Sequence, residues 1–288
     1  MTDTMNIQWY PGHMTKTRRQ IEADLKLVDA VCEIVDARIP VSSRNPDIDA
    51  ICGDKPRMIV LNRMDLADPA ATKKWAEYFR RKGMAVIATD CKSKKGISAF
   101  TPAARLACAE KLERDAKRGM NRPLRVMVVG IPNVGKSTLI NQISGRKSAK
   151  AENRPGVTRG KQWVTVDSGL QLLDTPGILW PKFEDPEVGM MLAYTGAVKE
   201  GVIDLEELAY RLMELLHKFY PQTLLERYKV EAPEGTPGWQ LLEMAARKRG
   251  YLVSGGEVNT ERMAKVLLDE FRSGKLGNFT LEMPEDMV

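Results

Sequence analysis

The stretch Gly130-Ile-Pro-Asn-Val-Gly-Lys-Ser137, here called the phosphate loop, constrains the fold of this chain more than any other. It fits the pattern G-x-x-x-x-G-K-S between an apolar run and a helical pattern, so it predicts a strand, a loop and a helix in that order. Glycines let the backbone wrap around phosphates, and the helix N-terminus supplies partial positive charge. A chance glycine-rich turn is the alternative, which the flanking strand disfavours. We expect nucleotide contacts from Asn133, Val134, Gly135, Lys136, Ser137 and Thr138.

Apolar runs alternate with helical patterns over the first part of the chain. Nearly continuous apolar runs predict the central strands of a parallel sheet that is buried on both faces. A hairpin is predicted where two short runs flank Asp-Ser-Gly. The alternation predicts an α/β fold with a doubly wound sheet. The expected strands are 30–37, 57–62, 84–90 and 125–130, the hairpin strands are 163–166 and 170–174, and the helices are 15–28, 69–82 and 98–118.

The pattern changes after about residue 185, where strands vanish and amphipathic helical periodicity takes over. We expect a nucleotide-binding domain over residues 1–183 and a smaller all-helical C-terminal domain over 184–288. The expected helices of the second domain are 187–199, 204–219, 237–249 and 258–272.

Composition excludes several classes of protein. No stretch approaches the roughly 18 apolar residues of a membrane span. The opening "MTDTMNIQWYPGHM" lacks the apolar region of a secretory signal. The four cysteines, Cys32, Cys52, Cys91 and Cys108, are scattered and form no CxxC pair. They indicate a reducing compartment, so we expect a cytoplasmic protein.

The net charge of +6 is unevenly distributed. Residues 1–200 hold 33 Lys and Arg against 23 Asp and Glu, a net +10, whereas 201–288 hold 11 against 15, a net −4. A phosphate-binding domain could be basic for that reason alone. Clustered cations near Trp9, Tyr10 and Trp163 nevertheless favour contact with the phosphate backbone of RNA, and no DNA partner is expected. The clusters are 15–19, 79–83, 92–96, 145–150 and 154–161.

Two further segments complete a nucleotide site. "DTPG" at 174–177 ends a predicted strand, so Asp174 could hold Mg²⁺ through water and the Gly177 N–H could contact a γ-phosphate. Lys136 would reach the β- and γ-phosphates, and the Ser137 hydroxyl would complete the Mg²⁺ shell. Thr158 is the preferred further Mg²⁺ ligand, although spacing alone leaves Thr165 and Thr175 open.

Asn62-Arg-Met-Asp65, here called the base motif, predicts the choice of base. The Asp65 carboxylate can accept both the ring N–H and the exocyclic amine of guanine, a donor pair that adenine lacks. A helix cap is the alternative role for these residues. The motif therefore favours GTP and GDP over ATP. Arg63 stands where lysine is usual, and Cys91 and Lys92 are positional candidates for a further base contact.

The order of these motifs resembles the circularly permuted GTPases, with residues 62–65 first, then 130–137, "RPGVT" at 154–158 and "DTPG" at 174–177. With "WYPGHM" (9–14) and "DARIP" (36–40), the chain is similar to the bacterial ribosome biogenesis GTPase A family. The resemblance implies a P-loop GTPase sheet in permuted order. It also implies a GTPase that binds the maturing large (50S) ribosomal subunit, through rRNA and ribosomal proteins, and promotes a late assembly step. The C-terminal domain would contribute to that contact, although its negative net charge argues against a simple basic platform.

Hydrolysis needs a group that orients water, and Ile178, directly after "DTPG", cannot do so. His217 lies among helical apolar positions and is expected to be a packing or surface residue. The resemblance implies that His13 is the catalytic group brought to the γ-phosphate when the partner binds, although it could anchor rRNA or cap a helix. The resemblance also implies that Asn133 helps to bind K⁺ beside the phosphates, where a turn-forming role is the alternative.

Two functions of different classes remain open. The first is a ribosome-assembly GTPase stimulated by the particle that it binds. The second is a GTP-dependent RNA-binding or signalling switch in which hydrolysis is secondary. In either case, Thr158 and the 174–177 turn directly precede the helical domain. We therefore expect nucleotide state to be transmitted through residues 178–186.

Overall fold

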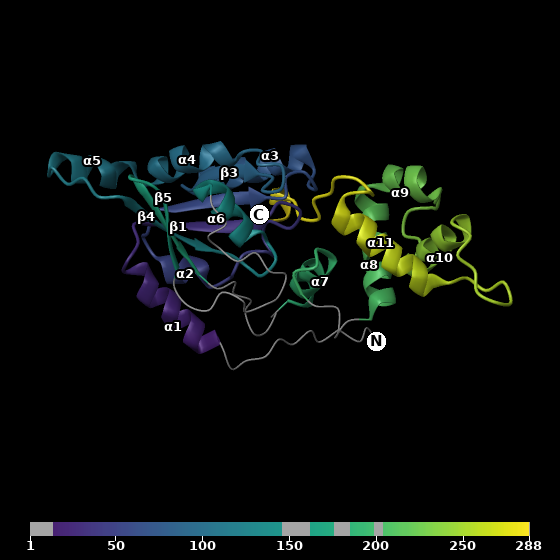
Figure 1. The fold of residues 1–288 in the computed structure, drawn as a ribbon. Coiled ribbons are helices and arrows are strands. Elements are labelled where there is room, and N and C mark those ends of the chain that lie inside the picture. The colour runs from purple at the N-terminus through teal and green to yellow at the C-terminus, as the bar shows by residue number, and fades with distance from the viewer. Residues whose placement is uncertain (1–13, 146–161, 176–184, 199–203, 288) are drawn as a thin grey trace. The chain divides into compact units, whose positions relative to one another are not determined.

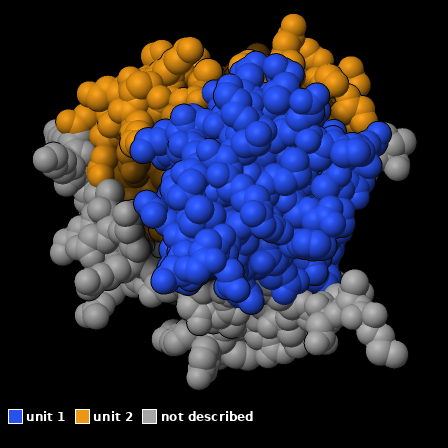
Figure 2. Space-filling view, turned by 90° about the vertical axis from the view of Figure 1, so that its right-hand side faces the viewer, with its two compact units in different colours: residues 1–7, 183–281 blue, residues 8–182, 282–288 orange. Residues whose placement is uncertain are grey.

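The computed structural model describes residues 14–145, 162–175, 185–198 and 204–287. The chain divides into two compact units, coloured separately in Figure 2. The sheet unit comprises residues 8–182 and 282–288, and the helical unit comprises 1–7 and 183–281.

Among the described residues of the sheet unit, six strands form one sheet (Figure 1). Their spatial order is β3-β2-β1-β4-β6-β5. All neighbours are parallel except the pair β5 and β6, which is the predicted hairpin. The central strand β1 is buried along its whole length, as its apolar sequence requires. The predicted α/β architecture is therefore confirmed. The strands are β1 (Ala30–Asp36), β2 (Arg57–Asn62), β3 (Ala85–Thr89), β4 (Leu124–Val129), β5 (Gln162–Asp167) and β6 (Leu170–Asp174).

The strand order reverses between β1 and β4. Strands β2 and β3 extend the sheet from β1 in one direction, while β6 and β5 extend it from β4 in the other. Ligands of open α/β sheets bind at the carboxyl ends of strands beside such a switch point. The loops after β1, β2 and β4 all leave the sheet at these carboxyl ends because the three strands are parallel.

The described residues of the sheet unit form six α-helices. α3 begins as predicted, because the Asp68 side chain accepts hydrogen bonds from the N–H groups of Ala70 and Ala71, at 2.7 and 3.0 Å. The single helix expected over 98–118 is two helices, since the backbone leaves the helical range at Cys108. The short helix α2 was not predicted. The helices are α1 (Met14–Leu25), α2 (Ile48–Cys52), α3 (Pro69–Arg81), α4 (Phe100–Ala107), α5 (Ala109–Lys117) and α6 (Lys136–Ser144).

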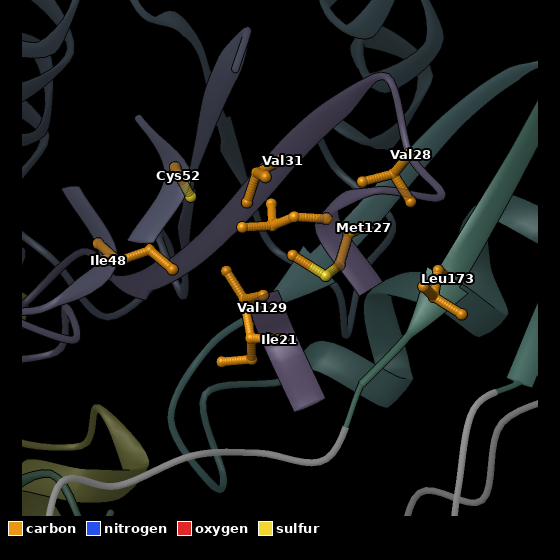
Figure 3. Close-up of a cluster of buried hydrophobic side chains, with 9 residues drawn as sticks. Ile21, Val28, Val31, Ile48, Cys52, Met127, Val129 and Leu173 are labelled. Carbon is orange, nitrogen blue, oxygen red and sulfur yellow. The ribbon is translucent and has the colours of Figure 1, made fainter. Parts of the chain in front are cut away.

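One face of the sheet carries two buried apolar clusters. In the cluster of Figure 3, Ile21 of α1 and Ile48 of α2 pack with Val31, Met127 and Leu173 of the strands. The second cluster joins α3 to β1, β2 and β3 and includes Trp75 and Phe79. Together the clusters hold the central strands in place, and so fix the carboxyl ends from which the loops leave.

The helical unit is built around α8, which contacts both α10 and α11. Gly238 begins α10 in close contact with α8, because a Cβ added there would lie 2.0 Å from the Tyr210 carbonyl oxygen. α9 was not predicted, because it follows α8 directly at Pro221. No helix among the described residues is long and apolar enough to cross a membrane. The helices are α7 (Pro186–Tyr194), α8 (Leu205–Phe219), α9 (Pro221–Tyr228), α10 (Gly238–Lys248) and α11 (Thr260–Ser273).

Candidate nucleotide-binding site

The phosphate loop joins β4 to α6, which begins at Lys136. Both of its glycines are required by the close approach of neighbouring groups. A Cβ at Gly130 would lie 2.6 Å from Ile34 Cγ2, and one at Gly135 would lie 2.4 Å from Asn62 Nδ2. Gly135 also has φ +103°, which side-chain-bearing residues rarely adopt. The loop thus lies directly against β1 and against the end of β2.

Lys136 forms a buried ion pair with Asp174. The Lys136 side chain is 6% exposed and that of Asp174 is 1% exposed. Lys136 follows β4 through the phosphate loop and Asp174 ends β6; these strands are neighbours, and Asp174 pairs with Val128 in their register. Two residues predicted to act on phosphate and Mg²⁺ are therefore brought together at the same strand ends.

Asn62 connects the base motif to the phosphate loop. Its Nδ2 donates to the Val134 carbonyl oxygen at 2.7 Å. Its Oδ1 accepts from Thr89 Oγ1 at 3.1 Å and from the Cys91 N–H at 3.3 Å. This buried amide therefore links the ends of β2 and β3 to the loop after β4. Sequence reasoning identified Asn62 as a base contact and did not anticipate that it fastens three segments.

Arg63 extends the same connection. It has φ +61°, and its Nη2 donates to the Asn133 carbonyl oxygen at 2.7 Å. Its Nε lies 3.7 Å from Asp36 Oδ2, at the end of β1. Arginine in place of lysine thus still reaches the phosphate loop. The exposed Asn133 has φ +61°.

Asp36 is a site residue to which sequence reasoning gave no role. Its carboxylate accepts from Arg38 Nε at 2.9 Å and from Arg38 Nη2 at 2.8 Å, and both side chains are buried. Burial alone would raise the pKa of Asp36, but the Arg38 guanidinium holds this pKa below its usual value, so the carboxylate stays ionised. The position of "DARIP" directly after a central parallel strand was the available signal.

The other base candidates differ in exposure. Asp65 and Lys92 are exposed, whereas Cys91 is buried. Burial raises the pKa of the Cys91 thiol to about 11, so it remains protonated at neutral pH. The Lys92 N–H donates to Asp90 Oδ1 at 2.8 Å, which shapes the turn after β3.

The remaining predicted residues are distributed as follows. Ser137 and Thr138 lie half-buried in the first turn of α6. Thr175 Oγ1 donates to the Val128 carbonyl oxygen at 2.7 Å, which engages the hydroxyl within the protein. No group of three or more His, Cys, Asp or Glu side chains among the described residues could hold a metal ion by itself. His13, Thr158 and Gly177 lie outside the described residues, as does most of 178–186.

His217 is the second histidine of the chain. Its Nε2 lies 3.1 Å from the Ala232 carbonyl oxygen, within the helical unit. This contact fits the predicted packing role.

Comparison with known proteins gives consistent relatives over nearly the whole chain. The family model described as "50S ribosome-binding GTPase" matches residues 125–220, beginning at β4. Ribosome biogenesis GTPase A from Priestia megaterium is 45% identical over 285 residues, covering 98% of this chain and 98% of that protein.

Two solved structures are similar in fold. A GDP-bound structure of YlqF matches with a TM-score of 0.67 and 30% identity, covering 93% of this chain and 100% of that chain. A GNP-bound structure of YlqF from T. maritima matches with a TM-score of 0.62 and 29% identity, covering 94% and 99%. The permuted order of the motifs, the sheet and these relatives agree, and the chain belongs to the ribosome biogenesis GTPase A family.

Proposed function

We propose that this protein is a GTPase that binds the maturing large (50S) ribosomal subunit and promotes a late assembly step, with hydrolysis stimulated by the particle. The ribosomal partner is inferred from the names of the relatives. The observation that carries the nucleotide chemistry is the 2.7 Å hydrogen bond from Asn62 Nδ2 to the Val134 carbonyl oxygen. It joins a base motif and a phosphate loop that lie 72 residues apart in the chain.

The phosphate loop would bind the nucleotide phosphates. The close approach at Gly130 and Gly135 supports this role, because a backbone without side chains leaves its N–H groups accessible to a polyanion. Lys136 would transfer part of its interaction from Asp174 to the β- and γ-phosphates. The exposed Asp65 would accept from the ring N–H and amine of guanine.

The oxygen donors of Ser137 and Asp174 fit Mg²⁺, a hard cation that binds oxygen ligands and retains water. Ser137 and Thr158 would be direct ligands and Asp174 would act through water. Asn133 would help to hold K⁺. Bound there, the two cations would neutralise charge that develops on the phosphates. The Gly177 N–H would contact the γ-phosphate, and His13 would orient the attacking water, since Ile178 cannot.

The basic surface of the sheet unit supports contact with rRNA. Exposed cations flank both ends of the edge strand β3, at 80–82 and at 92–95. At the other edge, Trp163 of β5 is 39% exposed, and the Arg125 guanidinium lies 5.2 Å from its ring centroid. Cations and an accessible aromatic ring together suit a single-stranded or distorted RNA segment.

The alternative is a GTP-dependent RNA-binding or signalling switch. Unaided GTPase switches turn over at about 10⁻⁴ to 10⁻² per second, so slow intrinsic hydrolysis fits both functions. Only the assembly GTPase should gain turnover, as opposed to affinity, from its particle.

The deciding experiment is GTP turnover in KCl with and without purified large ribosomal subunits. We expect a rise of about two decades or more, in the range that partner proteins give to GTPases. Small subunits are the control and should give no rise. His13→Ala should lose the stimulation with unchanged GTP affinity, and NaCl should lower the rate. Intact GTP binding without any stimulation would support the switch.

A further inference from the structure

The chain passes between its two compact units three times, near residues 7 and 182 and again at 281–282. Directly after the last passage, Glu282 fastens the C-terminal segment 282–287 to the rest of the sheet unit. Its carboxylate accepts from the Val41 N–H at 2.7 Å and from the Ser42 N–H at 3.0 Å. Its carbonyl oxygen accepts from Trp75 Nε1 at 2.9 Å, and Trp75 is fully buried. Three hydrogen-bond donors from two separate segments of the sheet unit thus hold Glu282, so this is a firm attachment.

The attached segment is the loop that follows β1. The Asp36 N–H donates to Ser43 Oγ at 2.9 Å, and Ser43 Oγ donates to the Ile39 carbonyl oxygen at 2.7 Å. Ser43 and Asp36 are buried. These two hydrogen bonds close the loop into a turn that begins at Asp36. Residues 41–42, whose N–H groups donate to Glu282, belong to this turn.

Asp36 in turn reaches the phosphate loop through Arg63. The Arg63 guanidinium lies between two oxygens, with Nη2 2.7 Å from the Asn133 carbonyl and Nε 3.7 Å from Asp36 Oδ2. A guanidinium holds several N–H donors in one rigid plane, so it can contact two oxygens at once, whereas an ammonium is a single point of charge. An unbroken series of contacts thus runs from Glu282 through the turn, Asp36 and Arg63 to Asn133.

We propose that Glu282 is a positioning residue for the phosphate loop. Through the turn, Asp36 and Arg63, it couples the C-terminal segment 282–287 of the sheet unit to the geometry at Asn133, and hence to nucleotide release. This inference rests on the proposed role of residues 130–137 in binding phosphate. Coupling through packed and hydrogen-bonded groups of this kind changes ligand equilibria without contact to the ligand.

The first test measures GDP dissociation from the full-length protein with a fluorescent GDP analogue. Glu282→Ala leaves two N–H groups without their acceptor, and we expect the dissociation rate to rise about 3- to 10-fold. Glu282→Gln keeps the shape and one acceptor, so a smaller rise in the same direction is expected. Glu285→Ala is the matched control. It removes an exposed ion pair to Lys74 in the same segment and should leave the rate within about 2-fold.

The second test separates positioning from simple destabilisation by a double-mutant cycle with Arg63→Lys. If the two residues act through one series of contacts, Glu282→Ala should accelerate GDP release much less in the Arg63→Lys background. Equal effects in both backgrounds, or a lowered melting temperature with an unchanged dissociation rate, would make Glu282 a structural anchor only. If Glu282→Ala does not fold, the same cycle is run with Glu282→Gln.

A third variant distinguishes a failure of this inference from a failure of the proposed phosphate-binding site. Lys136→Ala should abolish GDP binding if residues 130–137 hold the phosphates. Normal GDP binding by Lys136→Ala would overturn the site, whereas loss of binding together with an inert Glu282 would overturn the coupling alone.

Discussion

At the scale of single residues, the ion pair of Lys136 and Asp174 is the feature with the clearest energetic consequence. Both groups are buried, so each depends on the other for its charge balance. Removing one partner of a buried pair strands the remaining charge, which typically costs about 3–5 kcal/mol.

We therefore expect Asp174→Asn to lower thermal stability strongly in the absence of nucleotide. GDP added in EDTA, without Mg²⁺, should restore more stability to the variant than to the wild type, because the phosphates supply the missing negative charge. Differential scanning fluorimetry with and without GDP measures both effects. Glu243→Gln, which opens an exposed pair to Arg247, is the control, with a loss of about 0.5 kcal/mol or less expected. If Asp174→Asn were as stable as the wild type, the ion pair would contribute little to stability and the prediction would be wrong.

At the scale of elements, the approach of the phosphate loop to the end of β2 can be tested by adding a single methyl group. Gly135 and Gly83 have similar positive φ angles, +103° and +79°. A Cβ at Gly135 would meet Asn62 Nδ2 at 2.4 Å, whereas a Cβ at Gly83 would meet nothing within 4 Å.

Gly83→Ala and Gly135→Ala should therefore share the strain of a positive φ, about 1–2 kcal/mol. Only Gly135→Ala should displace Asn62 and weaken GDP binding, by about 2- to 10-fold if the net worth of one buried hydrogen bond is lost. Titration with a fluorescent GDP analogue, alongside melting curves, measures the two effects separately. Equal GDP affinities in the two variants would contradict the role of Asn62 in joining the base motif to the phosphate loop.

The strands and the phosphate loop were predictable because their signals are local. Continuous apolar runs marked β1, β2, β3 and β4, and the pattern of residues 130–137 marked the turn into α6. The break at Cys108 was not predictable, because helical periodicity continues across it. The contacts of Asn62 with Val134, and of Glu282 with Val41, join residues 72 and 241 positions apart. No local pattern encodes such pairings, since only the assembled sheet brings them together.

At the scale of the whole molecule, charge is divided between the parts of the chain, with +10 over residues 1–200 and −4 over 201–288. If the exposed cations Lys92, Lys94 and Lys95 contact rRNA phosphates, each contributes to counterion release. Their binding energy is then strongly dependent on salt concentration.

We expect replacement of these three lysines by glutamine to weaken binding to large subunits. The slope of log affinity against log salt concentration should become shallower by about 2–3. Sedimentation or filter binding over a series of KCl concentrations gives the slope. Glu110→Gln with Glu113→Gln, on the exposed helix α5, is the control for an altered net charge. An unchanged slope in the lysine variant would exclude this surface from the contact.

The attachment at Glu282 also has a consequence for the order of events during synthesis of the chain. A chain is synthesised from its N-terminus, so β1, β2 and the base motif exist before the phosphate loop is made, and Glu282, the acceptor for Val41 and Ser42, is added after all of them. A nascent or C-terminally truncated chain can contain every nucleotide-binding motif and still lack the group that steadies them. Synthesis of the segment that contains Glu282 would then be the event that sets how long a nucleotide stays bound.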